Sequence, residues 1–392
     1  MNTLLARFKN RTTAVTVVVF SLWLSLYLYA STLPLYVQSK VDNLAVTGTV
    51  LSMYGLWQFI VRLPVGIAAD WAGRRKPFIL AGMLLAALGA WGLSLGQDAG
   101  GLTLARALTG LGAATWVPLL VFFSSLFPPE QAFRATGLVT LINTLARMLG
   151  SAVNGPLNTL SGSYALAFYL AALAALLGFG LMLFIPEKQQ PPRPPAPRRL
   201  LALILRADVL GPALLNLVLH YGDWSSTYSF IPILARQHGA SDVVISTLTG
   251  VTLGVVSLGN LLVTWLGTRL RFSVMLVVAF VMIAGGLGLA ALAPSLAVVI
   301  AAQLAIGVGF GIAYPLLLGA CIRHVDGAER ATAMGLNQAV YAGGMFAGPW
   351  LSGLISNALG IQPMFAITAG VILTAGTLGV LALRAKTSAQ PG

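Results

Sequence analysis

Three arginines, Arg62, Arg106 and Arg147, lie inside stretches of sequence that are otherwise apolar enough to remain in a lipid bilayer. A charged side chain costs about 2.5–3.5 kcal/mol at the centre of a membrane helix, so it normally faces a water-filled path or a partner. One carboxylate, Asp223, is embedded in the same way. Residues of these types could bind a polar solute and carry a proton along a route through a membrane.

The surroundings of Asp223 favour proton transfer. Asn216, His220, Asp223 and Thr227 are spaced 4, 3 and 4 residues apart, which places them on one face of a helix that needs water or polar partners. Burial favours the protonated form of a carboxyl group, whereas a nearby arginine favours the ionised form. We expect Asp223 to load and release a proton, with His220 and Arg106 as modulators. The alternative is a static ion pair between Asp223 and Arg106.

Two of the arginines have different expected roles. Arg147 shares a broad polar helical face with Asn143, so we expect it to anchor a negative or strongly polar substrate group. The alternative is a packing arginine that backbone carbonyls satisfy. Arg62 is close enough to the end of its segment to reach the membrane surface, which favours a role in gating.

These side chains need membrane-spanning helices to position them. Hydrophobic residues make up 57% and charged residues 8% of the 392 positions, far from the roughly 25% charge of a soluble domain. A spanning helix needs about 20 apolar residues. Twelve segments qualify, at residues 13–37, 45–68, 77–97, 101–125, 132–157, 163–185, 208–235, 243–268, 273–293, 296–321, 331–357 and 363–384.

Positive charge is unevenly distributed around these segments. With the N-terminus in the cytoplasm, 18 of the 23 Lys and Arg residues fall at inner ends or inner loops, whereas Lys40 and Arg236 fall outside. This asymmetry follows the positive-inside rule, so we expect both termini in the cytoplasm and the protein in the cell (inner) membrane. The net charge of +13 is then an orientation signal and not a nucleic-acid-binding surface.

No cluster of residues indicates an enzyme or a cofactor site. Cys321 is the single cysteine, which excludes an intramolecular disulfide and a cysteine-based metal site. His220, His238 and His324 fall at separate levels of the predicted helices. We therefore expect no catalytic residues, no metal and no cofactor.

The chain consists of two similar halves. Arg106, Gly110, Gly112 and Pro118 in the fourth segment recur at an offset of 197 residues in the tenth, with glutamine in place of the arginine. Further matches at offsets of 194 to 198 include Pro34, which recurs as Pro232. A proline-rich stretch that resists both helix and core separates the halves. Two six-helix bundles in parallel repeat are therefore expected, with substrate near mid-membrane at their interface.

The loop after the second segment, GIAADWAGRRK, resembles the signature loop of the major facilitator superfamily, G-x-x-x-D-x-x-G-R-R/K. The matching residues are Gly66, Asp70, Gly73, Arg74 and Arg75. Arg106 with Gly110 and Gly112 is similar to the fourth-helix motif R-x-x-x-G-x-G. The resemblance covers essentially the whole chain.

This resemblance implies an all-α membrane fold of twelve transmembrane helices in two pseudo-symmetric bundles. We expect the first bundle at residues 1–187, a cytoplasmic Pro/Arg-rich linker at 188–206 and the second bundle at 207–392. In the family, helices one, four, seven and ten line the cavity. Together with the polar face around Arg147, this predicts a substrate cavity formed by Tyr29, Arg106, Trp116, Asn143, Arg147, Asn216, Tyr221, Trp224, Thr227, Phe310 and Tyr314.

The resemblance also implies that the signature loop, with Arg62, acts as an inner gate. A carboxylate at Asp70 could cap the helix that starts near Ala331 in one conformation of the cycle. Thr264 replaces the aspartate in the second half, so any latch should be one-sided. The alternative is a plain basic inner loop.

Efflux antiporters of the superfamily carry the motif G-x8-G-x3-G-P in helix five. Helix five of this chain matches it in part and helix eleven matches it fully. This favours export, although a glycine-rich hinge without directional meaning is the alternative. The hinge residues so predicted are Gly155, Pro156, Gly344, Gly348 and Pro349.

We therefore expect a secondary active transporter that works by alternating access and resembles the proton-coupled efflux permeases for drugs and other small molecules. Proton-coupled uptake of an organic anion is the alternative that the unpaired arginines favour, and flipping of a lipid-linked head group is a third. The expected partners are a small-molecule substrate, protons and the lipid bilayer, without nucleic acid. We expect the functional unit to be a monomer.

Overall fold

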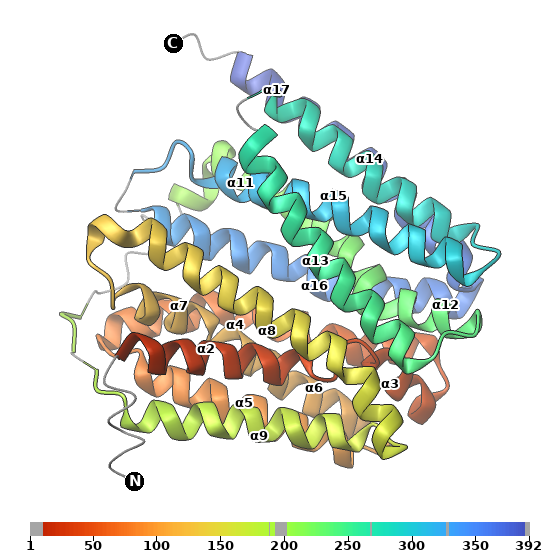
Figure 1. The fold of residues 1–392 in the computed structure, drawn as a ribbon. Helices are drawn as coiled ribbons and strands as arrows, with labels where there is room; N and C mark the ends of the chain where they lie inside the picture. Colours follow the sequence, from red (N-terminus) through yellow and green to blue (C-terminus); the bar gives the residue numbers. More distant parts are fainter. Residues whose placement is uncertain (1–10, 188, 193–201, 267–268, 327–328, 389–392) are drawn as a thin grey trace.

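The fold is entirely helical in the residues that the structure describes. The computed structural model describes residues 11–187, 189–192, 202–266, 269–326 and 329–388. Within them, every regular element is a helix (Figure 1). This confirms the predicted all-α class.

The first half begins with α2 (Arg11–Tyr27), α3 (Leu33–Val41), α4 (Leu44–Ala72) and α5 (Lys76–Leu95). It continues with α6 (Ala99–Ala114), α7 (Trp116–Ser124), the short 3-10 turn η1 (Pro129–Gln131), α8 (Ala132–Ser161) and α9 (Ala165–Phe184). Side chains fix two of the helix starts: Asn43 accepts a hydrogen bond from the Val46 N–H, and Asp98 accepts one from Gly101. Such N-caps satisfy N–H groups that have no partner within the helix.

The second half contains α11 (Ala207–Ser225), the π-helical turn η2 (Ser226–Phe230), α12 (Ile231–Gln237) and α13 (Asp242–Leu266). These are followed by α14 (Phe272–Ala291), α15 (Leu296–Ile322), α16 (Arg330–Leu359) and α17 (Ile361–Ser388). The predicted linker, residues 188–206, lies mostly outside the described residues. Its described part ends in Arg206, whose guanidinium pairs with the Asp208 carboxylate at 2.7 Å.

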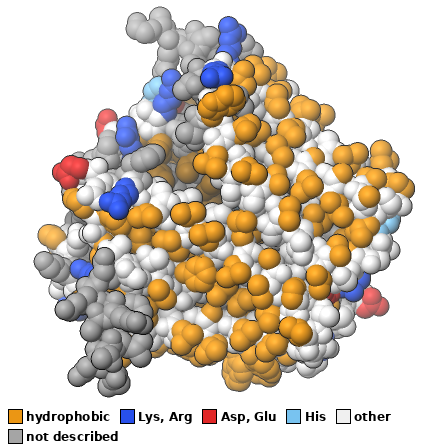
Figure 2. Space-filling model, in the orientation of Figure 1, with side chains coloured by type: hydrophobic (Ala, Val, Ile, Leu, Met, Phe, Trp, Pro, Cys, Tyr) orange, Lys and Arg blue, Asp and Glu red, His pale blue; other side chains and the backbone are white. Residues whose placement is uncertain are grey.

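Nine spans within the described ranges are long and apolar enough to cross a membrane, with α6 and α7 counted together. The other three predicted spans are α2 with α3, α11 with η2 and α12, and α16. The first two are interrupted and α16 is more polar. The result agrees with the predicted twelve-helix architecture, and hydrophobic side chains cover much of the surface shown in Figure 2.

Helix α2 begins and α17 ends at the same end of the bundle (Figure 1). We call this the termini end, and we call the opposite end, which carries α3 and α12, the far end. Lys and Arg side chains gather toward the termini end in Figure 2.

The first and seventh spans are broken at matching places, which differs from the continuous segments predicted at 13–37 and 208–235. Pro34 lies in the first turn of α3 and Pro232 in the first turn of α12. Proline has no N–H to donate to the preceding turn, so it is tolerated at a helix start and kinks or breaks a helix interior. The two breaks therefore follow the internal repeat.

The two halves pack through two helix pairs, α4 with α16 and α8 with α13. Gly48 and Gly353 lie against each other between α4 and α16, and a methyl group at either would overlap the opposing backbone. Small residues allow such close approach of helices inside a membrane. A third contact lies at the centre, where Trp224 and Tyr228 of the second half belong to a hydrophobic cluster built mainly by the first.

Candidate functional site

Asp223 lies on α11, three residues before the π-helical turn. It is buried, with 8% of its surface exposed, and its Oδ1 accepts a 2.7 Å hydrogen bond from the Thr227 hydroxyl. Thr227 in turn accepts a 3.0 Å bond from the Gln303 amide on α15. These bonds connect the carboxylate to the position that corresponds to Arg106 in the repeat.

His220 lies one turn before Asp223, within an aromatic group. Its Nδ1 is 2.9 Å from the Asn216 carbonyl oxygen. The ring stacks on Tyr341 of α16 with centroids 4.0 Å apart, and meets Phe310 and Tyr314 of α15 edge-on at 5.2 and 5.7 Å. The structure thus brings together four predicted residues, His220, Asn216, Phe310 and Tyr314, and adds Tyr341.

Arg147 bridges the two halves at the centre. Its Nη2 donates to the Tyr228 hydroxyl at 3.1 Å. Its guanidinium lies over the ring of Tyr27 at 4.6 Å and over that of Trp23 at 5.9 Å. Tyr27 and Trp23 belong to α2, so this arginine is held by aromatic groups from both halves. The electrostatic interactions of Asp223 include one with Arg147.

Arg106 is more deeply buried than Arg147, with 4% of its surface exposed. Its guanidinium lies 4.4 Å from the centroid of the Tyr54 ring on α4, and its Nη1 is 3.5 Å from the Thr109 hydroxyl. Arg106 and Asp223 form no ion pair. The alternative of a static pair between them therefore has no support in this conformation.

An aromatic belt connects the surroundings of the two arginines. Tyr54 stacks on Trp224 at 5.2 Å, Trp224 meets Tyr228 at 4.9 Å, and Tyr228 meets Tyr27 at 5.9 Å. Trp23 extends the belt to Trp116 at 5.1 Å. We define the belt as Trp23, Tyr27, Tyr54, Trp116, Trp224 and Tyr228.

The remaining predicted cavity residues lie around the belt or behind it. Asn216 donates to the Asn337 side chain at 3.2 Å, and Asn143 is half-buried on α8. Tyr221 is buried and belongs to the core of the second half. Tyr29 is 1% exposed and packs on Phe168 at 5.2 Å, which places it in the core of the first half.

Arg62 connects α4 with α16. It is 2% exposed, bonds to the Gln58 side chain, and donates to the Tyr341 hydroxyl at 3.1 Å and to the Gln338 carbonyl at 3.4 Å. The side chain was expected to reach the membrane surface, but it is instead buried in the contact between the two halves, and its role in gating stays a prediction.

The signature loop is bound to its own half in this conformation. Asp70 accepts a 2.8 Å bond from Arg75, and 47% of the Asp70 side chain is exposed. Gly73 ends α4 with a φ of +63°, which glycine adopts without strain. Gly66 lies near Val117 of the fourth span. A cap by Asp70 on α16 stays a prediction.

Glu187 was not predicted, yet it organises this loop. Its carboxylate accepts from the backbone N–H groups of Arg75 at 2.6 Å and Lys76 at 3.1 Å, where a helix start favours negative charge. Arg74 bonds to the Gln189 side chain at 3.0 Å. The residues after α9 therefore tie the loop to the beginning of the linker.

The predicted hinge residues are sites of close helix packing. A methyl group at Gly344 would overlap the Leu217 backbone of α11, and one at Gly348 would lie 2.8 Å from the Tyr221 carbonyl oxygen. Gly155 packs in the same way on Asp242 of α13. Pro156 and Pro349 lie inside α8 and α16 without ending them.

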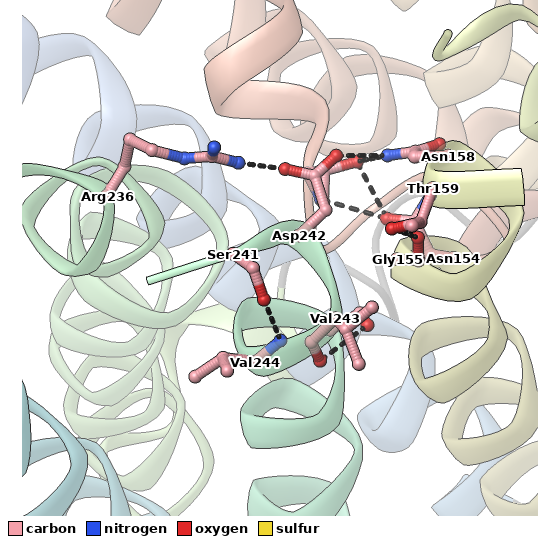
Figure 3. Close-up of polar contacts among 11 residues, drawn as sticks. Asn154, Gly155, Asn158, Thr159, Arg236, Ser241, Asp242, Val243 and Val244 are labelled. Carbon is pink, nitrogen blue, oxygen red and sulfur yellow. Dashed lines mark hydrogen bonds and ion pairs between the residues drawn. The ribbon is translucent and has the colours of Figure 1, made fainter. Parts of the chain in front are cut away.

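A polar cluster joins the halves at the far end (Figure 3). The Asn158 amide donates to the Asp242 carboxylate at 2.8 Å. It also donates to the Thr32 hydroxyl at 3.0 Å. Asp242 also pairs with Arg236, and the Thr32 hydroxyl donates to Asn154 Oδ1 at 2.9 Å. We call these five residues the far-end clasp.

Sequence reasoning missed several of these residues because it selected only some aromatic residues on the four helices expected to line a cavity and, beyond those helices, only the polar face around Arg147. Trp23 and Tyr27 are spaced four residues apart on α2, a helical repeat that could have been found. Tyr341 and Asp242 lie on the eleventh and eighth spans, and only the packing of α16 and α13 against the other half reveals their place.

Comparison with known proteins identifies the family. A family model described as Major Facilitator Superfamily matches residues 15–218 and 213–392. The chain belongs to this superfamily. It is accordingly a multi-pass membrane protein and a transporter rather than an enzyme. In each half of the fold, the first span is broken at the matching proline.

Solved transporters of this superfamily share the fold. The chain is similar to a point mutant of the nucleoside transporter NupG, with a TM-score of 0.80, 16% identity, and 95% of this chain and 99% of the other covered. It is also similar to a bacterial homolog of the human lysosomal transporter Spinster in an inward-facing, unoccupied conformation, with a TM-score of 0.79, 15% identity and coverage of 95% and 96%.

A curated relative matches part of this chain. The inner membrane transport protein YajR of Escherichia coli (strain K12) is 28% identical over 145 residues. That alignment covers 36% of this chain and 30% of the relative, so the chain spans less than a third of the length of this relative in the match.

Proposed function

We propose that the protein is a proton-coupled secondary transporter that moves an amphiphilic, aromatic small molecule by alternating access, with Asp223 as the proton site. The bundles at 1–187 and 207–392 are proposed as the two units that move against each other. The observation that carries the proposal is the position of Asp223, a buried carboxylate next to the aromatic belt that joins both halves.

The hydrogen bonds of Asp223 suit a group that changes protonation state. The Gln303 amide donates to Thr227, and the Thr227 hydroxyl donates to Asp223, which is the direction that stabilises an ionised carboxylate. Protonation would replace a charge-assisted bond with a weaker neutral one. Loading a proton therefore weakens the bond between Thr227 and Asp223, which is one of the two bonds that connect the carboxylate to Gln303 on α15.

We propose export as the direction of transport. The support is the glycine–proline motif in α16, whose Gly344 and Gly348 hold this helix against α11 beside the belt and Asp223. A second candidate is proton-coupled uptake of an organic anion. The arginines beside the belt favour it, because neither Arg106 nor Arg147 forms an ion pair with a described residue.

Proteoliposomes with an imposed pH gradient would test the proposal. Cationic, neutral and anionic aromatic compounds would be added while internal pH is followed with a trapped dye. We expect at least one compound to evoke proton movement, and its sign relative to substrate movement distinguishes exchange from co-transport.

The decisive variant is Asp223→Asn, which should abolish proton movement and retain exchange of substrate for substrate. Asp98→Asn is the matched control, because asparagine caps a helix about as well as aspartate and Asp98 caps α6. Full pH dependence of transport in Asp223→Asn would refute the proton role of Asp223.

A further inference from the structure

The positive charge around the belt exceeds the negative charge. Arg62, Arg106 and Arg147 carry three positive charges, and Asp223 carries the one negative charge identified beside them. The ion pairs between described residues are Arg75–Asp70, Arg206–Asp208 and Arg236–Asp242. These involve none of the three central arginines.

Aromatic rings compensate this charge only in part. Arg106 lies over Tyr54 and Arg147 over Tyr27, and each contact is a cation–π interaction. Such interactions recover less than the cost of removing an arginine from water. The Nε atoms of Arg62, Arg106 and Arg147 are buried and make no hydrogen bond to a described residue.

Arg147 is the arginine best placed to meet a ligand. It is half-buried, whereas Arg106 and Arg62 are 4% and 2% exposed. A guanidinium has five N–H donors, and among the described residues the Arg147 side chain uses one of them, on the Tyr228 hydroxyl. The remaining donors form a planar fork that matches the oxygens of a carboxylate, sulfonate or phosphate.

The surroundings of Arg147 define the rest of the ligand. Tyr27 and Trp23 flank the guanidinium, and the belt continues from Tyr228 through Trp224. Flat apolar rings of this kind bind aromatic bodies by stacking or edge contacts. A molecule with an oxyanion on an aromatic ring system satisfies both the arginine and the belt.

We propose that the substrate is an aromatic organic anion whose oxyanion group is bound by Arg147, with Arg106 supplying further positive charge. This inference rests on the proposed transport function but not on its direction. Tyr228 is a positioning residue, because its hydroxyl fixes the Arg147 guanidinium.

The test compares three probes that share one naphthalene ring. They are 2-naphthalenesulfonate, neutral 2-naphthalenesulfonamide and permanently cationic (2-naphthylmethyl)trimethylammonium. Binding to the full-length protein in detergent is measured by quenching of tryptophan fluorescence, since Trp23, Trp116 and Trp224 lie in the belt. The sulfonate should bind at least about tenfold tighter than the other two, as expected for one charge-assisted contact.

The variants separate binding from folding. Arg147→Gln should weaken sulfonate binding about tenfold or more and weaken binding of the neutral sulfonamide by a clearly smaller factor. Arg147→Lys should recover part of the loss, because it keeps the charge without the fork. Tyr228→Phe removes only the positioning hydroxyl and should weaken sulfonate binding by a smaller factor. Arg134→Gln, an exposed position on the same helix, is the matched control.

The outcomes distinguish this inference from the transport proposal. Sulfonate binding that depends on Arg147, without proton-coupled transport, would support the anion site and refute the proposed function. No sulfonate binding, equal binding of all three probes, or sulfonate binding unaffected in both Arg147→Gln and Tyr228→Phe would overturn the anion site. Transport could then still be found with another compound.

Discussion

Replacing Asn158 with alanine should shift the protein toward conformations in which its far end is open. In the far-end clasp, Asn158 of α8 donates to the Asp242 carboxylate of α13 at 2.8 Å, and Asn158 is 6% exposed. A hydrogen bond to a charged partner contributes about 1.5–3 kcal/mol. Because about 1.4 kcal/mol corresponds to a factor of ten, the ratio of open to closed far ends should rise about 10- to 150-fold.

Distance measurements between spin labels can detect this change. Labels at Ser161 on α8 and Gln237 on α12 are both exposed and report on opposite halves at the far end. They require a background without Cys321, the single cysteine, which is buried. Asn158→Ala should add a population at longer distance to the one that corresponds to this structure.

Two further variants make the measurement specific to the clasp. Thr159→Ala is the matched control, because Thr159 bonds to the Gly155 carbonyl of its own helix. Asp242→Asn should give a smaller shift than Asn158→Ala, since it keeps an acceptor for Asn158 but loses the ion pair with Arg236. An unchanged distance distribution in folded Asn158→Ala would refute the argument that this contact holds the far end closed.

Three other predictions concern packing, capping and charge. Gly348→Ala should lower the free energy of unfolding by about 1–3 kcal/mol, as overpacking does, because the new methyl group meets the α11 backbone. Thermal unfolding in detergent checks this. Gly370→Ala is the control and should be neutral, because the methyl group there has open space. Glu187→Gln should lower the free energy of unfolding by about 1–2 kcal/mol, because it removes a charge that accepts two backbone hydrogen bonds at the start of α5. Gln189→Ala is the control in the same assay, and an equal stability of the two variants would contradict the capping role of Glu187. Asp223→Asn should strengthen binding of 2-naphthalenesulfonate, because it removes the negative charge next to the belt. A fluorescence titration that shows weaker binding would argue against repulsion between the Asp223 carboxylate and the bound sulfonate.

The number and order of the helices could be predicted from sequence because bilayer thickness imposes a length on every span. The segment predicted at 296–321 is α15 at Leu296–Ile322, and that predicted at 132–157 is α8 at Ala132–Ser161. The interruptions near Pro34 and Pro232 were not predicted, although both prolines were recognised as a repeat. A hydropathy pattern records how apolar a segment is and contains no information about where its backbone bonds change register.

The central residues could be predicted by type but not by partner. Arg106, Arg147 and Asp223 stand out because a charge in an apolar run is costly wherever it points. The partner of Asp223 is the Thr227 hydroxyl on its own span, whereas the two arginines lie over rings from α2 and α4, and aromatic residues are common in membrane helices for packing reasons alone. The sequence therefore showed which side chains needed compensation, while only the packing of helices within the first half shows that Tyr54 compensates Arg106 and Tyr27 compensates Arg147.

The matching breaks in the first and seventh spans have a mechanical consequence. Each leaves a short piece, α3 or α12, joined to a long membrane helix by a few residues without a regular α-helical ladder, and the two pieces touch across the halves. Bending at these joints would require fewer lost contacts than tilting an entire bundle. The far end can thus open by movement of α3 and α12, each bending relative to the long helix of its own half.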